Sequence, residues 1–237
     1  MAIRLWAGEG VVNRYKFFIG KKLFRRCFSA YASEKLCGTV LDVGSGHGPF
    51  KELVHCKRYI SLEYQLHLRP SVVGSALAIP FKDGSFDGVI CTEVLEHLPE
   101  PEGCIREVKR ILRRGGLLYM TAPMLWPLHY EPHDYFRFTK YGLLYLLEKN
   151  DFGVLELQAI GGLFSFVSMR FCEKLYNLLN KLPFFLPKEV RFVWTVPVIL
   201  PVSWFLYFLS LLLDPLFKRD VFAWCVLAQC WKKMDGP

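Results

Sequence analysis

Three glycines at alternate positions follow an aspartate in the stretch LDVGSGHGPF, Leu41 to Phe50. The stretch overlaps a short apolar run, Thr39 to Val43, that predicts a strand. Glycines at a strand end allow a tight turn and let a ligand approach main-chain N–H groups, because no Cβ is in the way. We expect Gly44, Gly46 and Gly48 to form such a turn and to open a helix. A purely structural bend is the alternative for these glycines taken alone.

A carboxylate stands at the spacing that a nucleoside-binding turn requires. The next predicted strand, Tyr59 to Glu63, ends in Glu63, 19 residues after Gly44. At the tip of a neighbouring strand this carboxylate can accept hydrogen bonds from both hydroxyls of a ribose. The glycine turn and Glu63 together favour a nucleoside ligand.

Further elements position these residues. Apolar runs predict strands at Phe86 to Thr92 and, after the breaker pair Gly115-Gly116, at Leu117 to Ala122. Between them, apolar residues recur at helical spacing from Ile105 to Leu112, with charged residues on the other face. Strand, helix and strand in succession predict a parallel sheet with right-handed crossovers.

Composition indicates one large domain in a reducing compartment. The chain has 237 residues, of which 52% are hydrophobic, enough for one substantial core. Its eight cysteines form no CxxC pair and no zinc spacing, so we expect free thiols. Charges from Arg14 to Arg26 interrupt any apolar segment of a signal peptide, which favours a cytoplasmic location.

Most of the net charge of +8 lies in the first 38 residues, which hold eight Lys or Arg and two Glu. The stretch RYKFFIGKKLFRRCF interleaves these charges with aromatic residues. It fits a lid helix with a solvated charged face and equally a basic amphipathic helix on anionic lipid. A nucleic-acid face is disfavoured because no nucleic-acid motif follows.

The sequence between about Val40 and Gly161 resembles the class I S-adenosylmethionine-dependent methyltransferases, and within them the type 11 group. Asp42-x-Gly44-x-Gly46-x-Gly48 is similar to the first motif of that family, and GSALAIPFKDGSFDGVICTEVLEHL to its third and fourth strands. RILRRGGLLYMTAP resembles the helix and turn before the fifth strand. The resemblance implies a Rossmann-like α/β fold with a seven-stranded, mostly parallel sheet and helices on both faces. A dinucleotide oxidoreductase is disfavoured because GxGxG lacks the GxGxxG spacing.

The resemblance also implies roles for particular residues toward S-adenosyl-L-methionine. Asp42 and the main chain from Gly44 through Ser45 to Gly46 would face the methionine part, with Gly48 completing the motif. Glu63 would bind the ribose, and Ser75, Ala76 and Leu77 would face the adenine. Ser75 departs from the family, which usually has an acid there, and a hydroxyl forms the weaker hydrogen bond. Thr92, Glu93 and His97 would line the pocket.

Methyl transfer from a sulfonium requires positioning of the acceptor and, for a phenol, hydroxyl or amine, removal of a proton. The candidate bases, His129 and His133, lie in PMLWPLHYEPHDYFRFT after the fifth strand. A structural loop that packs over the cofactor and shapes the acceptor pocket, with Asp134 paired to Arg137, is favoured over a histidine base. Pro132 separates the two histidines and disfavours a helical metal pair.

A second polar cluster comprises Glu93, Glu96 and His97. A helix starting directly after the fourth strand would place them on one face, where they could hold a divalent ion. Pocket lining and helix capping are favoured because TEVLEHL is common in the family, and we therefore predict no metal site.

The stretch Phe192 to Leu213 has 22 residues without a charge, long enough to cross a bilayer core of about 30 Å. A single crossing would leave the last strand on the wrong side of the membrane, because two antiparallel strands, Phe152 to Ala159 and Val221 to Trp231, are expected to finish the sheet. We therefore expect a re-entrant or surface-lying hairpin kinked at Pro197 and Pro201. A buried subdomain or dimer face is the alternative.

The predicted organisation is a basic lid or arm at 1–38, a methyltransferase core at 39–159 and 220–233, and a hydrophobic helical insertion at 160–219. We expect methyl transfer to a hydrophobic or lipid-linked acceptor by a peripheral or monotopic protein on an anionic membrane surface. The alternatives are a small soluble acceptor, with the insertion as pocket wall or dimer interface, and a non-catalytic membrane scaffold. No nucleic-acid partner is expected, and the sequence leaves the oligomeric state open.

Overall fold

The computed structural model describes residues 18–179, 181, 188–216 and 223–230. The chain divides into two compact units. One comprises residues 25–160 and 223–237 and contains the sheet, and the other comprises residues 1–24 and 161–222. The predicted roles of the N-terminal arm and of the insertion remain predictions.

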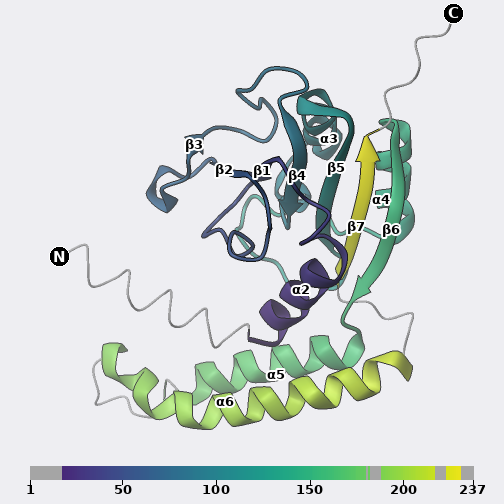
Figure 1. Ribbon diagram of the computed structural model, residues 1–237. Coiled ribbons are helices and arrows are strands. Elements are labelled where there is room, and N and C mark those ends of the chain that lie inside the picture. The colour runs from purple at the N-terminus through teal and green to yellow at the C-terminus, as the bar shows by residue number, and fades with distance from the viewer. Residues whose placement is uncertain (1–17, 180, 182–187, 217–222, 231–237) are drawn as a thin grey trace, which may run out of the picture. The chain divides into compact units, whose positions relative to one another are not determined.

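The first unit contains a seven-stranded sheet in the order β3-β2-β1-β4-β5-β7-β6 (Figure 1). Its strands are β1 (Thr39–Val43), β2 (Arg58–Glu63), β3 (Val72–Val73), β4 (Phe86–Thr92), β5 (Leu112–Pro123), β6 (Phe152–Ile160) and β7 (Ala223–Cys230). β1 lies between β2 and β4 and pairs in parallel with both. The chain order reverses there, and ligands of open parallel sheets bind at such a point, beyond the carboxyl ends of the strands.

The predicted strands are confirmed, with one correction at the end of the sheet. β7 runs antiparallel to β5 and to β6, so β6 has the same direction as β5. Only the last strand is therefore antiparallel, where two were predicted. β6 reaches the sheet edge after helix α4 (Lys140–Lys149), and such a crossover returns the chain in its original direction.

Helices cover both faces of the sheet. Leu41 and Val43 of β1 lie in a core cluster with Ile105 and Val108 of α3 (Pro101–Ile111) and with residues of α4. The opposite face carries Tyr119 of β5, which contacts Phe28 of α2 (Phe18–Tyr31) edge-on, with ring centroids 5.0 Å apart. All eight cysteines are free thiols, as predicted.

The predicted helix after the glycine turn is absent from the described residues. Hydrogen-bonded turns occupy this stretch, with Gly48 N–H donating to the Ser45 carbonyl at 2.7 Å and Lys51 N–H to the Gly48 carbonyl at 3.2 Å. Pro49 and three left-handed glycines stand here, and β2 begins at Arg58. The segment between Pro49 and the start of β2 is too short for a helix of several turns.

The second unit is built on two long helices, α5 (Leu163–Leu179) and α6 (Lys188–Leu213), which run side by side (Figure 1). Pro197 and Pro201 lie inside α6. Residues 1–17 of the predicted basic arm and residues 217–219 at the end of the predicted insertion lie outside the described residues.

Candidate active site

The glycine turn lies at the carboxyl end of β1. Gly44, Gly46 and Gly48 have φ values of +64°, +51° and +64°, a region that residues with a Cβ rarely adopt. The N–H groups of Gly44 and Ser45 donate to the Leu62 carbonyl of the neighbouring strand at 2.9 and 3.1 Å. These contacts fix the turn against the end of β2.

Glu63 points toward the glycine turn. Its Oε2 accepts a hydrogen bond from Gly46 N–H at 2.9 Å, and its Oε1 accepts from the N–H groups of Tyr64 and Gln65 at 2.8 and 3.2 Å. A carboxylate offers about four acceptor positions, so about one remains for a ligand. A ribose that engaged it through both hydroxyls would have to replace one of these donors, most easily the long bond from Gln65.

Asp42 lies beneath the turn and is fully buried. Its Oδ2 accepts a short hydrogen bond from the Tyr59 hydroxyl, while Oδ1 is buried without a hydrogen-bond partner in the described structure. Burial raises the pKa of Asp42 from its ordinary 3.8 to about 7, an effect that the Tyr59 hydrogen bond opposes and the Glu63 charge reinforces. The orphaned Oδ1 is consistent with a polar ligand group at this position.

The raised pKa of Asp42 predicts a pH-dependent stability. The folded state retains a proton between pH 4 and pH 7 that the unfolded chain has released, so this group lowers the free energy of unfolding as pH rises through that window. We expect Asp42→Asn, which keeps an acceptor for Tyr59, to reduce the fall by up to about 4 kcal/mol. Urea unfolding at several pH values measures this; an unchanged slope would contradict it.

The residues predicted to face an adenine form a turn after β3. Ser75 Oγ accepts from Leu77 N–H at 3.1 Å, and Ser75 bridges to Ala78. Ala76 and Leu77 are partly buried against the core. The Ser75 hydroxyl is therefore engaged within its own turn.

Thr92 is the last residue of β4 and pairs in register with Thr121 of β5, and Glu93 follows it. Glu93 has a φ of +53°, and its Oε1 accepts from the Thr121 hydroxyl at 2.9 Å. Burial raises the pKa of Glu93 to about 7. The helix that would have placed Glu93, Glu96 and His97 on one face is not formed, because Leu95–His97 form a single 3₁₀ turn. The left-handed residue at 93 turns the chain, so Glu93 does not share a face with Glu96 and His97.

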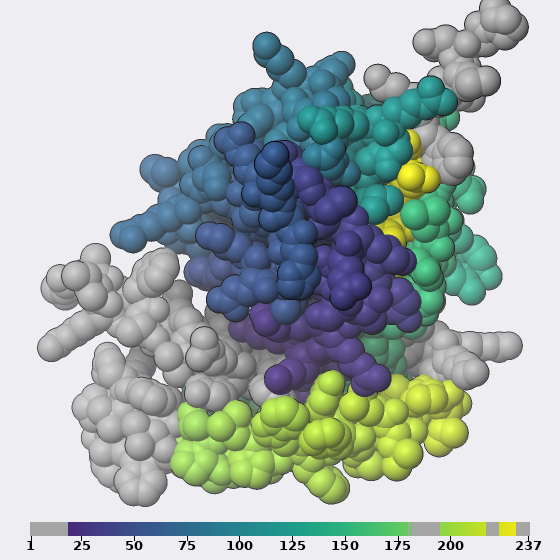
Figure 2. Space-filling model, viewed as in Figure 1, coloured from purple at the N-terminus to yellow at the C-terminus, as the bar shows by residue number. Residues whose placement is uncertain are grey.

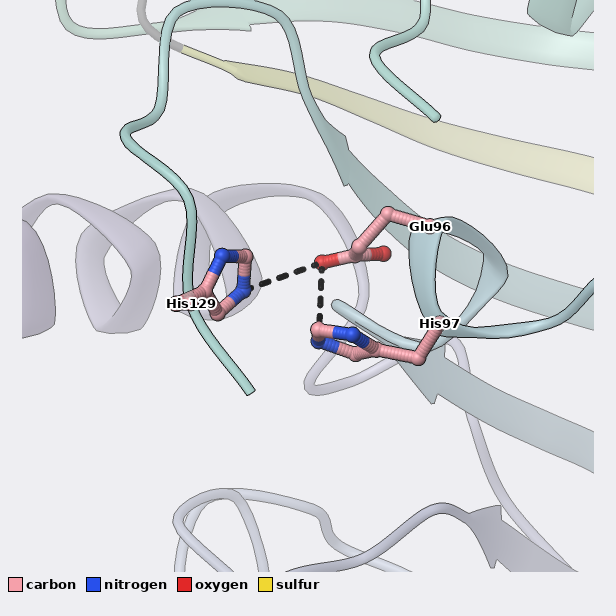
Figure 3. Close-up of side chains that lie close together, drawn as sticks. All are labelled: Glu96, His97 and His129. Atoms are coloured by element: carbon pink, nitrogen blue, oxygen red, sulfur yellow. Dashed lines mark ion pairs between the residues drawn. The ribbon is translucent and has the colours of Figure 1, made fainter. Parts of the chain in front are cut away.

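Glu96 and His97 instead meet His129, which comes from the loop after β5 (Figure 3). The Nε2 atoms of His97 and His129 lie 3.8 and 4.0 Å from Glu96 Oε1. Glu96 is fully buried, and burial raises the pKa of its carboxyl well above the ordinary value. Burial also lowers the pKa of His129, against the opposing charge of Asp134, which favours the neutral imidazole.

The loop that carries His129 is held by Arg137 and Asp134. Arg137 Nη1 and Nη2 each donate to one oxygen of Asp134 at 2.7 Å, which confirms the predicted pairing and lowers the pKa of Asp134. Asp134 Oδ2 accepts from His129 N–H at 2.9 Å. The N–H of Tyr135 donates to the Glu96 carbonyl at 2.8 Å and thereby docks the loop above β4. His133 contacts the Tyr135 hydroxyl through Nδ1 at 3.0 Å and is not part of the cluster.

Comparison with solved structures identifies the fold. A SAM-dependent methyltransferase from Archaeoglobus fulgidus is 17% identical, with a TM-score of 0.56 over 92% of this chain and 98% of that one. Phosphoethanolamine N-methyltransferase 2 of Haemonchus contortus, solved with S-adenosyl-L-methionine, is 14% identical, with a TM-score of 0.55 over 87% of this chain and 51% of that one. The chain therefore has the class I methyltransferase fold.

Residues 41–120 match the type 11 methyltransferase family model, which describes a methyltransferase domain. The ubiquinone biosynthesis O-methyltransferase of Xanthomonas oryzae is 33% identical over 100 residues, covering 35% of this chain and 42% of that protein. An uncharacterised protein of Methanocaldococcus jannaschii is 36% identical over 90 residues, 35% of this chain and 40% of that protein. The chain thus covers less than half the length of these curated relatives.

Proposed function

We propose that this protein transfers a methyl group from S-adenosyl-L-methionine to a hydrophobic or lipid-borne acceptor at a membrane surface. The observation that carries the cofactor assignment is the contact between Glu63 Oε2 and Gly46 N–H at the tips of adjacent strands. In this arrangement the Glu63 carboxylate, which would bind the ribose, lies beside the glycine main chain, which would bind the methionine part of the cofactor. Both lie where the strand order of the sheet reverses. The solved methyltransferases with this fold support the same ligand.

Glu63→Ala tests the cofactor assignment. We expect the Kd for S-adenosyl-L-methionine to rise about 10–100-fold, because hydrogen bonds to a charged group contribute about 1.5–3 kcal/mol. Titration calorimetry measures this, with Glu52→Ala as a control for an exposed carboxylate of the same loop region. An unchanged Kd in Glu63→Ala would remove Glu63 from the site. No binding by the unaltered protein at high micromolar cofactor would instead favour the non-catalytic scaffold.

For removal of the acceptor proton, His129 is better placed than His133. The neutral imidazole of His129 has Nδ1 within 3.2 Å of the Pro127 carbonyl and of Asp134 Oδ2, which leaves Nε2 as the basic atom. His129 lies beyond the ends of β4 and β5, on the side where ligands of this fold bind. His133 is engaged with the Tyr135 hydroxyl, so we assign it a role in shaping the loop.

The membrane part of the proposal rests on α6. Within the described residues, one helix, Thr195–Leu216, meets the length and apolarity of a membrane span, with a mean hydropathy of 2.1. Core helices of water-soluble proteins meet the same criteria but are mostly buried, whereas 22% of this apolar window is buried. Phe205, Phe208 and Leu212 are 67%, 59% and 72% exposed. Figure 2 shows the yellow-green side chains of α6 at the surface.

Helix α6 carries small polar side chains on its buried face and large apolar side chains on its exposed face, which is the reverse of a helix on the surface of a water-soluble protein. The buried positions of α6 recur every three or four residues: Thr195, Ile199, Ser203, Tyr207 and Ser210. Three of these five are small hydroxyl residues. Ser203 Oγ donates to Cys172 Sγ of α5 at 3.5 Å. Small and polar residues between helices with large apolar residues outside is the pattern of helices that pack within lipid.

Asp214, at the end of the apolar stretch, closes the helix pair into a hairpin. Its Oδ1 accepts from the N–H groups of Phe164 and Ser165 at 2.9 and 3.1 Å, and its Oδ2 accepts from Gly162 N–H at 2.9 Å. The carboxylate thereby caps the N-terminus of α5. Because the entry and the exit of the insertion are joined, the segment returns to the side from which it came.

The principal alternative is a methyltransferase for a small soluble acceptor, with the exposed face of α6 as a dimer interface. A detergent-free dimer that does not float with anionic vesicles would favour it. The membrane proposal instead expects flotation and a lipid-borne acceptor on the cytoplasmic face. Mass spectrometry of co-purified lipid would identify the acceptor class.

A further inference from the structure

Glu96 is an unusual residue because its carboxyl is fully buried and has no hydrogen-bond partner in the described structure. Neither Oε1 nor Oε2 accepts or donates a hydrogen bond, although the side chain is 0% exposed. A buried polar group without partners costs free energy, and a buried ionised carboxylate costs far more unless a cation compensates it. A bound cation would compensate the buried carboxylate.

Two imidazoles, of His97 and His129, point at this carboxyl, and each is held by a contact of its Nδ1 atom on the side away from Glu96. His97 Nδ1 lies 2.7 Å from the His133 carbonyl oxygen, and His129 Nδ1 lies 3.2 Å from the Pro127 carbonyl oxygen. A carbonyl oxygen only accepts, so each Nδ1 carries a proton, and in the neutral imidazole with this tautomer Nε2 presents a lone pair. Figure 3 shows both Nε2 atoms directed at Glu96 Oε1. Carboxylate and carbonyl partners on Nδ1 are typical of histidines that bind metals through Nε2.

We propose that Glu96, His97 and His129 bind one divalent transition-metal ion. One potential ligand atom from each of the three residues lies within 4.8 Å of the other two. Bonds of about 2.0–2.2 Å to tetrahedral zinc place ligand atoms about 3.4 Å apart. The distances of 3.8 and 4.0 Å to Glu96 Oε1 would therefore shorten by only a few tenths of an ångström on binding.

The ligand set selects the class of ion. Two neutral imidazoles and one carboxylate suit Zn²⁺, Fe²⁺ or Mn²⁺, whereas Mg²⁺ and Ca²⁺ prefer oxygen ligands. The side chains of His97 and His129 are 21% and 23% exposed, so solvent reaches the site. Glu93 is not part of this cluster, and its Oε1 accepts a hydrogen bond from the Thr121 hydroxyl. The proposed set differs from the sequence-based expectation that no metal site is present, and a titration with metal ions tests the two against each other.

The ion site depends on this cluster alone and would stand if the protein transferred no methyl group. If the protein is a methyltransferase, a Lewis acid at this place would lower the pKa of a hydroxyl acceptor bound to it. His129 would then be a ligand in the ion-loaded protein and a base only in its ion-free form.

The test is a titration of the full-length, tag-free, metal-free protein with Zn²⁺ and with Co²⁺. We expect one ion per chain, a rise in Tm, and the visible absorption of Co²⁺ with nitrogen and oxygen ligands. Loss of an outer hydrogen-bond partner of a metal ligand weakens metal binding roughly 10–100-fold, and we expect a loss of this size for Asp134→Asn. We expect larger losses of Zn²⁺ affinity for the three ligand variants, Glu96→Gln, His97→Ala and His129→Ala. Glu52→Gln and His55→Ala, at exposed positions, are the matched controls.

Three outcomes would overturn the proposal. A thiolate-to-cobalt charge-transfer band would assign the ion to cysteines, and equal losses in the control variants would assign it to the surface. Retention of full Zn²⁺ affinity by folded Glu96→Gln would remove the carboxylate from the site. Glu93→Gln separates this ligand set from one built on Glu93, because we expect its Zn²⁺ affinity to be unchanged.

Discussion

Gly44→Ala is expected to destabilise the protein by about 2–5 kcal/mol, from left-handed strain and overpacking together. Gly44 has a φ of +64°, and a Cβ placed on it would lie 2.4 Å from Val94 Cγ2. Val94 packs in the core cluster beneath the turn, so neither residue can move away easily. Urea unfolding of the purified variant measures the loss.

Gly46→Ala is the matched control because it separates strain from crowding. Its φ of +51° imposes similar strain, but a Cβ at this position meets nothing within 4 Å. We expect it to cost only about 1–2 kcal/mol. Because the open side of Gly46 is where we propose that the cofactor lies, the variant should fold and yet bind S-adenosyl-L-methionine weakly. Equal destabilisation by both substitutions would show that crowding against Val94 is unimportant.

Phe205→Glu together with Phe208→Glu is expected to abolish flotation with anionic vesicles. Both side chains are exposed on α6, and transfer of each from water to lipid contributes about 1.5–3 kcal/mol. The double substitution should therefore lower the vesicle partition coefficient about 100-fold or more, since two charges also enter the interface. Co-flotation on a density gradient measures it, with circular dichroism to verify folding.

Tyr141→Glu together with Tyr145→Glu is the matched control, because these side chains are exposed aromatics of α4. The membrane proposal expects this variant to float as the unaltered protein does. Equal loss in both double variants would point to a nonspecific effect of added charge. A Phe205/Phe208 variant that still floats would refute α6 as the membrane contact, and a switch from dimer to monomer would favour the dimer-face alternative.

The acceptor is not set by the fold. Structures below 25% identity share the architecture, and one architecture supports many activities. The loop from Trp126 to Arg137 and the helix pair α5 and α6 lie outside the matched residues 41–120, and we propose that such segments distinguish the acceptor. The proposed lipid-borne acceptor therefore depends on these segments and on the experiments that test them.

The sequence by itself determined the strands of the sheet and the contact between Glu63 and the glycine turn. Apolar runs at 39–43 and 86–92 gave the bounds of β1 and β4, because consecutive buried residues of a parallel strand leave a clear local pattern. The meeting of Glu63 with the glycine turn also followed, since parallel strands end at the same edge of the sheet. Both depend on local residue order and on a general rule of topology.

Only the tertiary structure decided which polar side chains share a site. His129 lies 33 residues after Glu96, and a loop conformation fixed by Arg137 and Asp134 brings them together. The left-handed Glu93 separates it from Glu96, although the sequence pattern placed both on one helix face. Likewise, Asp214 caps α5 from about 50 residues away. Local pattern cannot predict such contacts, because they depend on chain reversals and on side-chain competition for hydrogen-bond partners that exists only in the folded chain.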